Sequence, residues 1–133
     1  MVAWKDFKAA APEFAERVRR LFDAGRHKTI ATLGADGSPR ISGIECEFTD
    51  EGDLRFGSMT AARKGADLRR DPRFALHGPT LHPEPGREAD WTGEAKIAGR
   101  AILADRFSVE KMATTPSLSR TGNGSWPTSI GWS

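Results

Sequence analysis

The chain has 133 residues, enough for a single domain with one hydrophobic core. Its 20 basic and 18 acidic residues give a formal net charge of only +2, and the basic residues are spread along the chain. This pattern is typical of a solvated mixed surface and gives no basic stripe for nucleic acid. No stretch approaches the roughly 20 apolar residues of a membrane span, and the N-terminus lacks the apolar core of a secretory signal. We therefore expect a cytoplasmic protein that binds neither nucleic acid nor a membrane.

The clearest helical pattern covers residues 12–25. Pro12 suits the first helical position, and Gly25 suits the position after the last turn. The preceding Trp4 and Phe7 either extend this amphipathic layer or cap one end of a barrel, and the sequence leaves both readings open. Four apolar side chains recur at helical spacing opposite a charged face: Phe14, Val18, Leu21 and Phe22.

The apolar period changes to two after this helix, which indicates strands. Residues 28–48 read as two strands around a turn, and residues 54–59 read as a third strand. Ile41 falls out of the register of the later apolar residues in the second strand. This shift predicts a kink or bulge near Gly43.

The next part of the chain predicts one short helix and two more strands. Pro72 helps to end the helix, and residues 73–81 read as the fourth strand. A loop rich in proline and acids covers residues 82–90, and residues 91–104 read as the fifth and longest strand. Helices occur only at the start and between the third and fourth strands. This order predicts a mainly β fold, built as a small antiparallel barrel.

The end of the chain does not follow this pattern. Residues 113–133 are crowded with Ser, Thr, Gly and Pro and show no sustained period. We therefore predict one domain over residues 1–112 and an irregular C-terminal tail over residues 113–133.

A basic pair stands where the short helix begins. Arg63 and Lys64 occupy the expected first turn. A helix N-terminus already carries unpaired N–H groups and a partial positive charge, so cations there are disfavoured by about 0.3–1 kcal/mol each. An anion in front of the helix would reverse this preference, because backbone N–H, guanidinium and ammonium groups would all donate to it.

Three segments together resemble a known family. In chain order they are "RISGIE", "LRFGSMTAARKGADLRRDPRFALHG" and "WTGEAKIAGRA". Their order and spacing are similar to the pyridoxamine 5'-phosphate oxidase-like flavin-binding split barrels, over residues 27–103. The resemblance implies a split β-barrel and a homodimer with two flavin sites between the subunits. Each site would hold the phosphate of FMN or of a related deazaflavin, the 8-hydroxy-5-deazaflavin coenzyme.

The resemblance also implies which residues bind the cofactor. Arg63 and Lys64 match the family's phosphate-binding basic pair. Ser58 and Thr60 lie at the strand end where phosphate or ring contacts are made, and Arg40 matches an arginine of the second strand. The chain is then expected to be an FMN- or deazaflavin-dependent oxidoreductase that transfers a hydride or two electrons to or from a small molecule. No catalytic side chain is identifiable.

The sequence also departs from the family pattern. Several true oxidases carry a lysine five positions after the second-strand arginine, where this chain has Glu45. An acid near the ring would disfavour negative charge on a reduced flavin. The substrate-binding basic and histidine residues of the true oxidase have no counterpart here, so we do not expect the vitamin B6 biosynthetic oxidase itself. The family normally closes with another strand, where this chain has the irregular stretch from residue 113.

Other candidate chemistry is sparse. His77, His82, Glu84 and Glu88 lie in or beside a segment too rich in proline to place three or four ligands on one rigid face, so we predict no metal site. His77 is the obvious heme ligand if the chain is instead a non-catalytic flavin or heme storage protein. Cys46, the single cysteine, cannot form an internal disulfide, and its strand position favours a small buried hydrophobe.

Overall fold

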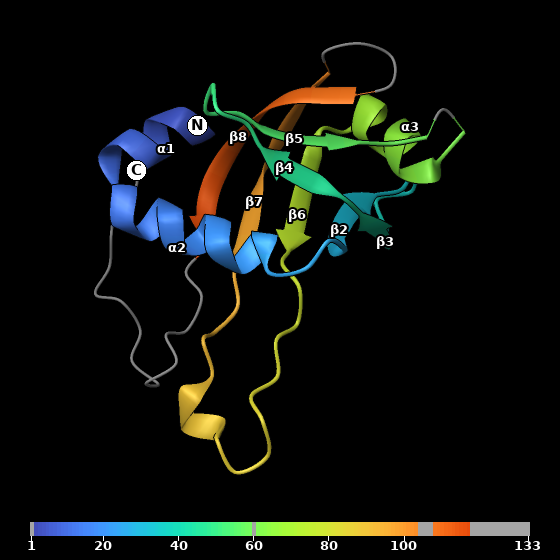
Figure 1. Ribbon diagram of the computed structural model, residues 1–133. Helices are drawn as coiled ribbons and strands as arrows, with labels where there is room; N and C mark the ends of the chain where they lie inside the picture. Colours follow the sequence, from blue (N-terminus) through green and yellow to red (C-terminus); the bar gives the residue numbers. More distant parts are fainter. Residues whose placement is uncertain (1, 60, 104–107, 118–133) are drawn as a thin grey trace.

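A computed structural model describes residues 2–59, 61–103 and 108–117 (Figure 1). Its helices are α1 (Trp4–Ala10), α2 (Pro12–Asp23) and α3 (Arg63–Arg70), with a short 3₁₀ turn at Glu88–Asp90. The strands are β1 (Val2–Ala3), β2 (Lys28–Leu33), β3 (Pro39–Ile44), β4 (Cys46–Phe48), β5 (Leu54–Gly57), β6 (Arg73–His77), β7 (Lys96–Leu103) and β8 (Ser108–Ser117). None of the helices described is long and apolar enough to cross a membrane.

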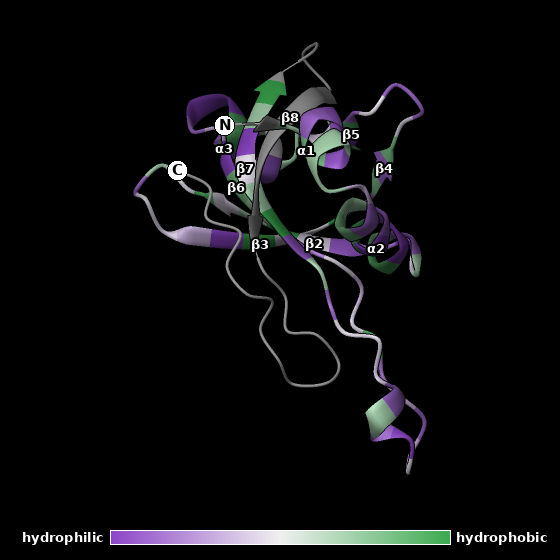
Figure 2. Ribbon diagram, turned by 90° about the vertical axis from the view of Figure 1, so that its left-hand side faces the viewer, coloured by the Kyte–Doolittle hydropathy of each residue, from purple (hydrophilic) through white to green (hydrophobic). Residues whose placement is uncertain are grey.

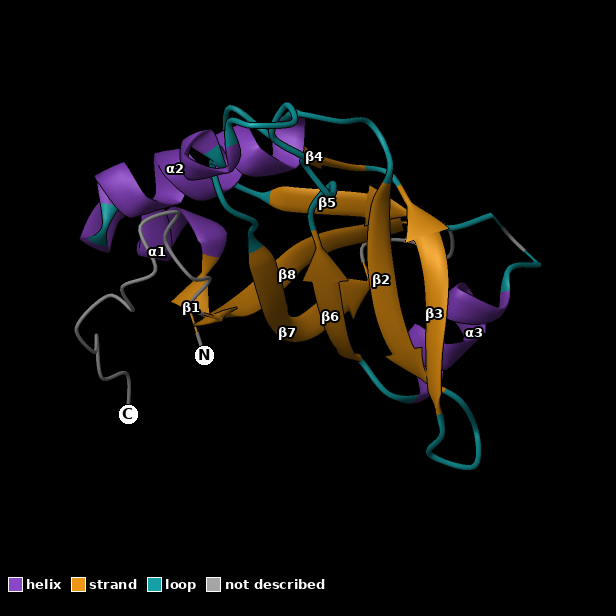
Figure 3. Ribbon diagram, turned by 90° about the horizontal axis from the view of Figure 1, so that it is seen from below, coloured by secondary structure: helices purple, strands orange, loops and turns teal. Residues whose placement is uncertain are grey.

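The strands form one curled antiparallel sheet in the order β3-β2-β6-β7-β8-β5-β4, with β1 paired to β8. The two ends of this order, β3 and β4, are consecutive in the chain and are separated only by Glu45. The predicted second strand therefore bends, pairing with β2 before the bend and with β5 after it. Figure 3 shows the curled sheet from below, with α1 and α2 at one end and α3 beside β3. The predicted mainly β split barrel and the bend near Gly43 are confirmed.

The interior follows the period-two pattern of the strands. Ile30, Leu54 and Leu76 are fully buried on three different strands. The rings of Phe56 and Phe74 meet edge to face, with centroids 5.4 Å apart. Burying side chains of this size contributes roughly 1.5–3 kcal/mol each, which is the main force that curls the sheet around its core.

The N-terminal helices cover one end of this core. Trp4 and Phe7 are buried on α1, a separate helix before α2. The Trp4 ring lies 4.6 Å from the ring of Phe48 on β4, and Phe22 of α2 reaches the same ring at 5.9 Å. Both alternatives for Trp4 and Phe7 therefore hold in part, since α1 extends the helical layer and also covers the barrel.

Two predicted strands are shorter than expected. β6 ends at His77 and β7 begins at Lys96 rather than at Trp91. The Trp91 indole instead donates to the carbonyl of Leu81 at 2.9 Å and ties the two ends of the intervening loop together. Figure 2 shows this loop projecting from the barrel, with hydrophilic residues along much of it.

The predicted irregular tail is wrong in its first part. β8 runs from Ser108 to Ser117 and pairs with β7 along its length, with Ala113 opposite Arg100. The predicted division at residue 113 thus falls inside a strand, and β8 supplies the additional strand that the sequence seemed to lack. Hydrogen-bonded pairing with the long strand β7 outweighs the low strand preference that the local Ser and Pro content indicates. The rest of the predicted tail, residues 118–133, lies outside the described residues.

Candidate functional site

Helix α3 begins at Arg63 with no acidic residue in its first turn. Its N-cap is Ala62, in extended conformation, and no side chain in the described part of the protein caps the helix. The N–H groups of Gly65 and Ala66 donate to the Ala62 carbonyl at 3.1 and 3.4 Å. The N–H groups of Arg63 and Lys64 are those that a first turn leaves for a cap or a ligand. The predicted passage from strand to helix with a basic pair in the first turn is confirmed.

A cleft of about 640 Å³ opens beside this helix end. We call it the α3 cleft. Residues 43–45 lie at the end of β3 and directly after it, residues 57–59 lie at the end of β5 and directly after it, and both line the cleft together with His27 and Lys64. Its volume lies in the range of roughly 300–1,000 Å³ that is usual for small-molecule sites.

Gly65 brings the end of β5 against α3. A Cβ atom added at Gly65 would lie 2.8 Å from the Ser58 hydroxyl oxygen and 3.3 Å from the Ser58 Cβ. Only glycine therefore lets Ser58 pack on the first turns of the helix without a shift. The sequence contains one signal for this close approach, a glycine inside the predicted helix. Glycine at such a position lowers helix stability by about 1 kcal/mol relative to alanine, so a packing or functional reason is expected.

Arg40 contacts α3 one turn further along. Its Nε donates to Asp67 Oδ2 at 2.7 Å, and the Arg40 side chain is 33% exposed. Asp67 is only 2% exposed and also accepts hydrogen bonds from the Thr32 hydroxyl at 2.8 Å and from Arg70 Nη2 at 3.0 Å. Burial raises the pKa of Asp67, but the hydrogen bonds from Arg40, Thr32 and Arg70 outweigh it and bring the pKa to about 2. Sequence reasoning missed Asp67.

The structure brings part of the predicted site together. Ser58 and Lys64 line the same cleft, whereas Arg63, which precedes Lys64 in the first turn of α3, is exposed and is not among the residues that line it. Arg40 reaches the helix through Asp67 and does not line the cleft. Thr60 lies outside the described residues.

Glu45, the acid that departs from the family pattern, lies in the α3 cleft with Ser58 and Lys64. Its Oε1 is 2.9 Å from Nε of Arg26. The Glu45 carboxylate is therefore paired with the guanidinium of Arg26, which lies just before β2.

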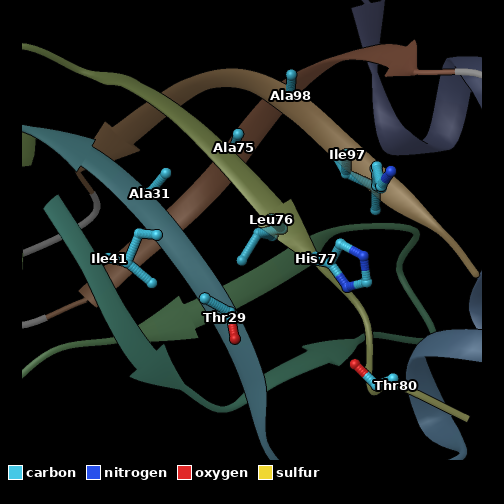
Figure 4. Close-up of a pocket in the computed structure, with 10 residues that line it drawn as sticks. Thr29, Ala31, Ile41, Ala75, Leu76, His77, Thr80, Ile97 and Ala98 are labelled. Atoms are coloured by element: carbon cyan, nitrogen blue, oxygen red, sulfur yellow. The ribbon is translucent and has the colours of Figure 1, made fainter. Parts of the chain in front are cut away.

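A second cleft, of about 450 Å³, lies on the outer face of β2, β3, β6 and β7 (Figure 4). We call it the sheet-face cleft. Ile41, which is 75% exposed, borders it. The outward side chains around it are short: Thr29, Ala31, Ala75 and Ala98. Most of this face is therefore apolar, and Lys96 and His77 add polar groups at one end.

Polar groups gather at one end of the sheet-face cleft. His77 Nδ1 lies 2.6 Å from the carbonyl oxygen of Gly78, and His77 Nε2 lies 3.3 Å from Glu94. Glu94 also accepts from Lys96 at 2.8 Å, and this hydrogen bond keeps the pKa of Glu94 below its usual value. Both nitrogens of His77 thus face oxygen atoms.

Cys46 packs partly buried against the core, and burial raises the pKa of its thiol to about 11. A thiol with this pKa stays protonated near neutral pH, in keeping with the predicted role as a small hydrophobe. Among the described residues no three His, Cys, Asp or Glu side chains gather as metal ligands.

The fold and the site define a small antiparallel split barrel with a basic pair in the first turn of α3. The sequence profile of the pyridoxamine 5'-phosphate oxidase family matches residues 14–129, most of the chain. The chain therefore belongs to this family. No curated protein sequence matches it.

Solved structures show the same fold. The conserved hypothetical protein Rv2991 from Mycobacterium tuberculosis is 16% identical, with a TM-score of 0.57 and 92% of each chain covered. An F420 reductase is 15% identical, with a TM-score of 0.53, 75% of this chain and 91% of that chain covered. The heme storage protein HutZ from Vibrio cholerae is 12% identical, with a TM-score of 0.55, 86% of this chain and 98% of that chain covered.

Proposed function

We propose that the protein is a flavin-binding oxidoreductase that holds FMN, or alternatively a deazaflavin coenzyme, in the α3 cleft. It would transfer two electrons to or from a small-molecule substrate. The observation that carries the proposal is the meeting of Ser58 and Lys64 in one cleft at the start of α3.

The residues present fit a phosphate group. Lys64 offers an ammonium charge, Ser58 a hydroxyl, and the neighbouring Arg63 a planar fork of N–H donors. Hydrogen bonds to charged groups contribute about 1.5–3 kcal/mol each. This gain exceeds the roughly 0.3–1 kcal/mol by which each cation is disfavoured at a helix N-terminus. A dianion therefore explains a basic pair that the helix alone does not favour.

A bound flavin would supply the hydride chemistry itself. The protein's contribution would be to anchor the phosphate, orient the ring and set the charge around it. Glu45, paired with Arg26, puts a carboxylate in the cleft where a lysine would favour an anionic reduced ring. This difference supports a reaction other than the vitamin B6 biosynthetic oxidation.

We further propose that the protein is a homodimer. Ile41 and the short side chains of the sheet-face cleft form an apolar surface on the four strands β2, β3, β6 and β7. β3 contributes to this surface and also to the α3 cleft, through Ile41 and Gly43 respectively. A second copy on the sheet face would therefore lie next to the cofactor and complete its binding site.

The alternative function is non-catalytic storage of a flavin or of heme. The fold shared with HutZ favours it, together with the position of His77 in an apolar cleft. His77 would first have to give up its contact with Glu94 or with the Gly78 carbonyl before binding iron.

The test is a visible absorption spectrum of the purified protein, followed by mass identification of any compound released on denaturation. We expect a yellow protein that releases FMN or a deazaflavin, and whose bound ring is reduced by a nicotinamide or deazaflavin donor. A red protein with an intense heme band would overturn the proposal in favour of the alternative. A protein that takes up no added cofactor would contradict both.

A further inference from the structure

Asp67 is the one buried carboxylate in the described part of the chain, with 2% of its surface exposed. Three elements donate to it: β2 through Thr32, β3 through Arg40, and α3 itself through Arg70. Taking charges out of water is expensive, and a buried ion pair is often no more stabilising than apolar side chains of the same size. Leu68, the next residue, already packs α3 onto the barrel with 7% exposure. Attachment of the helix alone therefore does not explain the charge.

The position of Asp67 suggests a further role. Asp67 is three residues after Lys64 and three before Arg70, so it is a neighbour of each on the surface of α3. Lys64 lines the α3 cleft one turn before Asp67, and Gly43 and Ile44 of β3 line it as well. The hydrogen bond from Arg40 to Asp67 thus joins β3 to α3, two elements that line this cleft.

We propose that Asp67 is a positioning residue for the phosphate end of the cofactor, and that Arg40 acts through it. The buried pair fixes α3 relative to β3, so that Lys64 and the first-turn N–H groups meet the phosphate at a set distance. A hydrophobic contact has no preferred direction, whereas the hydrogen bonds of a charged pair fix both angle and register. This inference rests on the proposed function. It adds that Asp67 and Arg40 together help the protein to recognise the phosphate of the cofactor.

The experiment compares FMN with riboflavin, which differ only by the phosphate. Dissociation constants for both are measured by fluorescence titration on the full chain, at about 0.5 M salt. At this ionic strength the Debye length is only a few ångströms. Any general attraction of anions to the unpaired arginines left by a substitution is then largely screened.

We expect Asp67→Asn to lower the preference for FMN over riboflavin by about tenfold, the effect of one misplaced charge-assisted hydrogen bond. Arg40→Lys keeps the charge but loses the Nε donor, and it should lower the preference to a similar extent. The double variant should lose no more than either single variant, because both break the same contact. Should Asp67→Asn not fold, Arg40→Lys carries the test, since the Arg40 side chain is one-third exposed.

Asp71→Asn is the matched control. Asp71 follows α3, pairs with Arg73 at the surface, and like Asp67 has a pKa lowered to about 2, through its hydrogen bonds from Arg73. This variant should keep the preference for FMN. The inference is overturned if Asp67→Asn or Arg40→Lys keeps the preference, or if their effects add. A wild-type protein that binds neither flavin and no deazaflavin coenzyme would instead overturn the proposed function, and the inference with it.

Discussion

The α3 cleft and the sheet-face cleft share strand β3 but differ in chemistry. The α3 cleft is lined by Lys64, Ser58 and Glu45 at the uncapped start of a helix, so its polar groups face a space that an anion can fill. In the sheet-face cleft short apolar side chains surround Ile41, and the polar groups at its end bond to one another. The comparison indicates that the first is suited to a charged ligand and the second to an apolar surface.

The largest expected effect concerns the sheet-face cleft. Ile41→Asp should convert the proposed dimer entirely to monomer, because two unpaired carboxylates would be buried in a symmetric interface. The monomer itself should be affected by less than about 0.5 kcal/mol, since Ile41 is 75% exposed. Light scattering after size exclusion checks the oligomeric state, and Ile41→Leu is the control that keeps the interface apolar. A dimer that persists in Ile41→Asp would place the interface elsewhere.

A pH titration sharpens the description of the α3 region. The folded-state pKa of Asp67, about 2, lies below the ordinary value of 3.8, so its ionised form stabilises the fold above pH 3.8. This contribution, about 2 kcal/mol, should be lost as the pH falls from 3.8 to 2. Denaturant unfolding across this range should show a loss larger by about 2 kcal/mol in the wild type than in Asp67→Asn, in which Asp71 and the other carboxylates of lowered pKa still titrate. Equal pH dependence in the two proteins would contradict the ionised, buried carboxylate.

A smaller effect is expected from Gly65→Ala. In an open helix this change would stabilise by about 1 kcal/mol. Here the new Cβ would meet Ser58 at 2.8 Å, so we expect a net loss of about 1 kcal/mol and weaker cofactor binding as Ser58 is displaced. Gly43→Ala is the control in the same cleft, because a Cβ there meets no atom within 4 Å. A Gly65→Ala protein of raised stability and unchanged affinity would show that the close approach is unimportant.

The smallest effect is expected from His77→Ala. It removes the contact with Glu94 at the end of the sheet-face cleft and leaves the α3 cleft untouched. Flavin affinity should therefore change by less than about threefold, and stability by roughly 0.5 kcal/mol, the order of one partly exposed polar contact. If the protein binds heme through His77, the variant would instead lose the heme absorption band. The cofactor would then lie in the sheet-face cleft and not in the α3 cleft.

Local features of the site were predictable from the sequence. The basic pair at the start of α3 follows from a strand, a turn and a helix within a dozen residues, and the bend predicted near Gly43 follows from the register of Ile41. Asp67 was not predictable, because its partners Thr32 and Arg40 are 35 and 27 residues away. β8 was missed for a similar reason. Its residues have weak strand character, and the pairing with β7 that makes them a strand is not a local property.

The most direct test of the central claim is FMN binding to Arg63→Ala/Lys64→Ala. Loss of two charge-assisted contacts should raise the dissociation constant at least about a hundredfold and leave the fold intact. Arg20→Ala/Arg87→Ala removes the same charge from exposed positions away from α3 and should bind FMN as the wild type does. A double variant of the basic pair that still copurifies with stoichiometric flavin would contradict the assignment of the α3 cleft as the phosphate site.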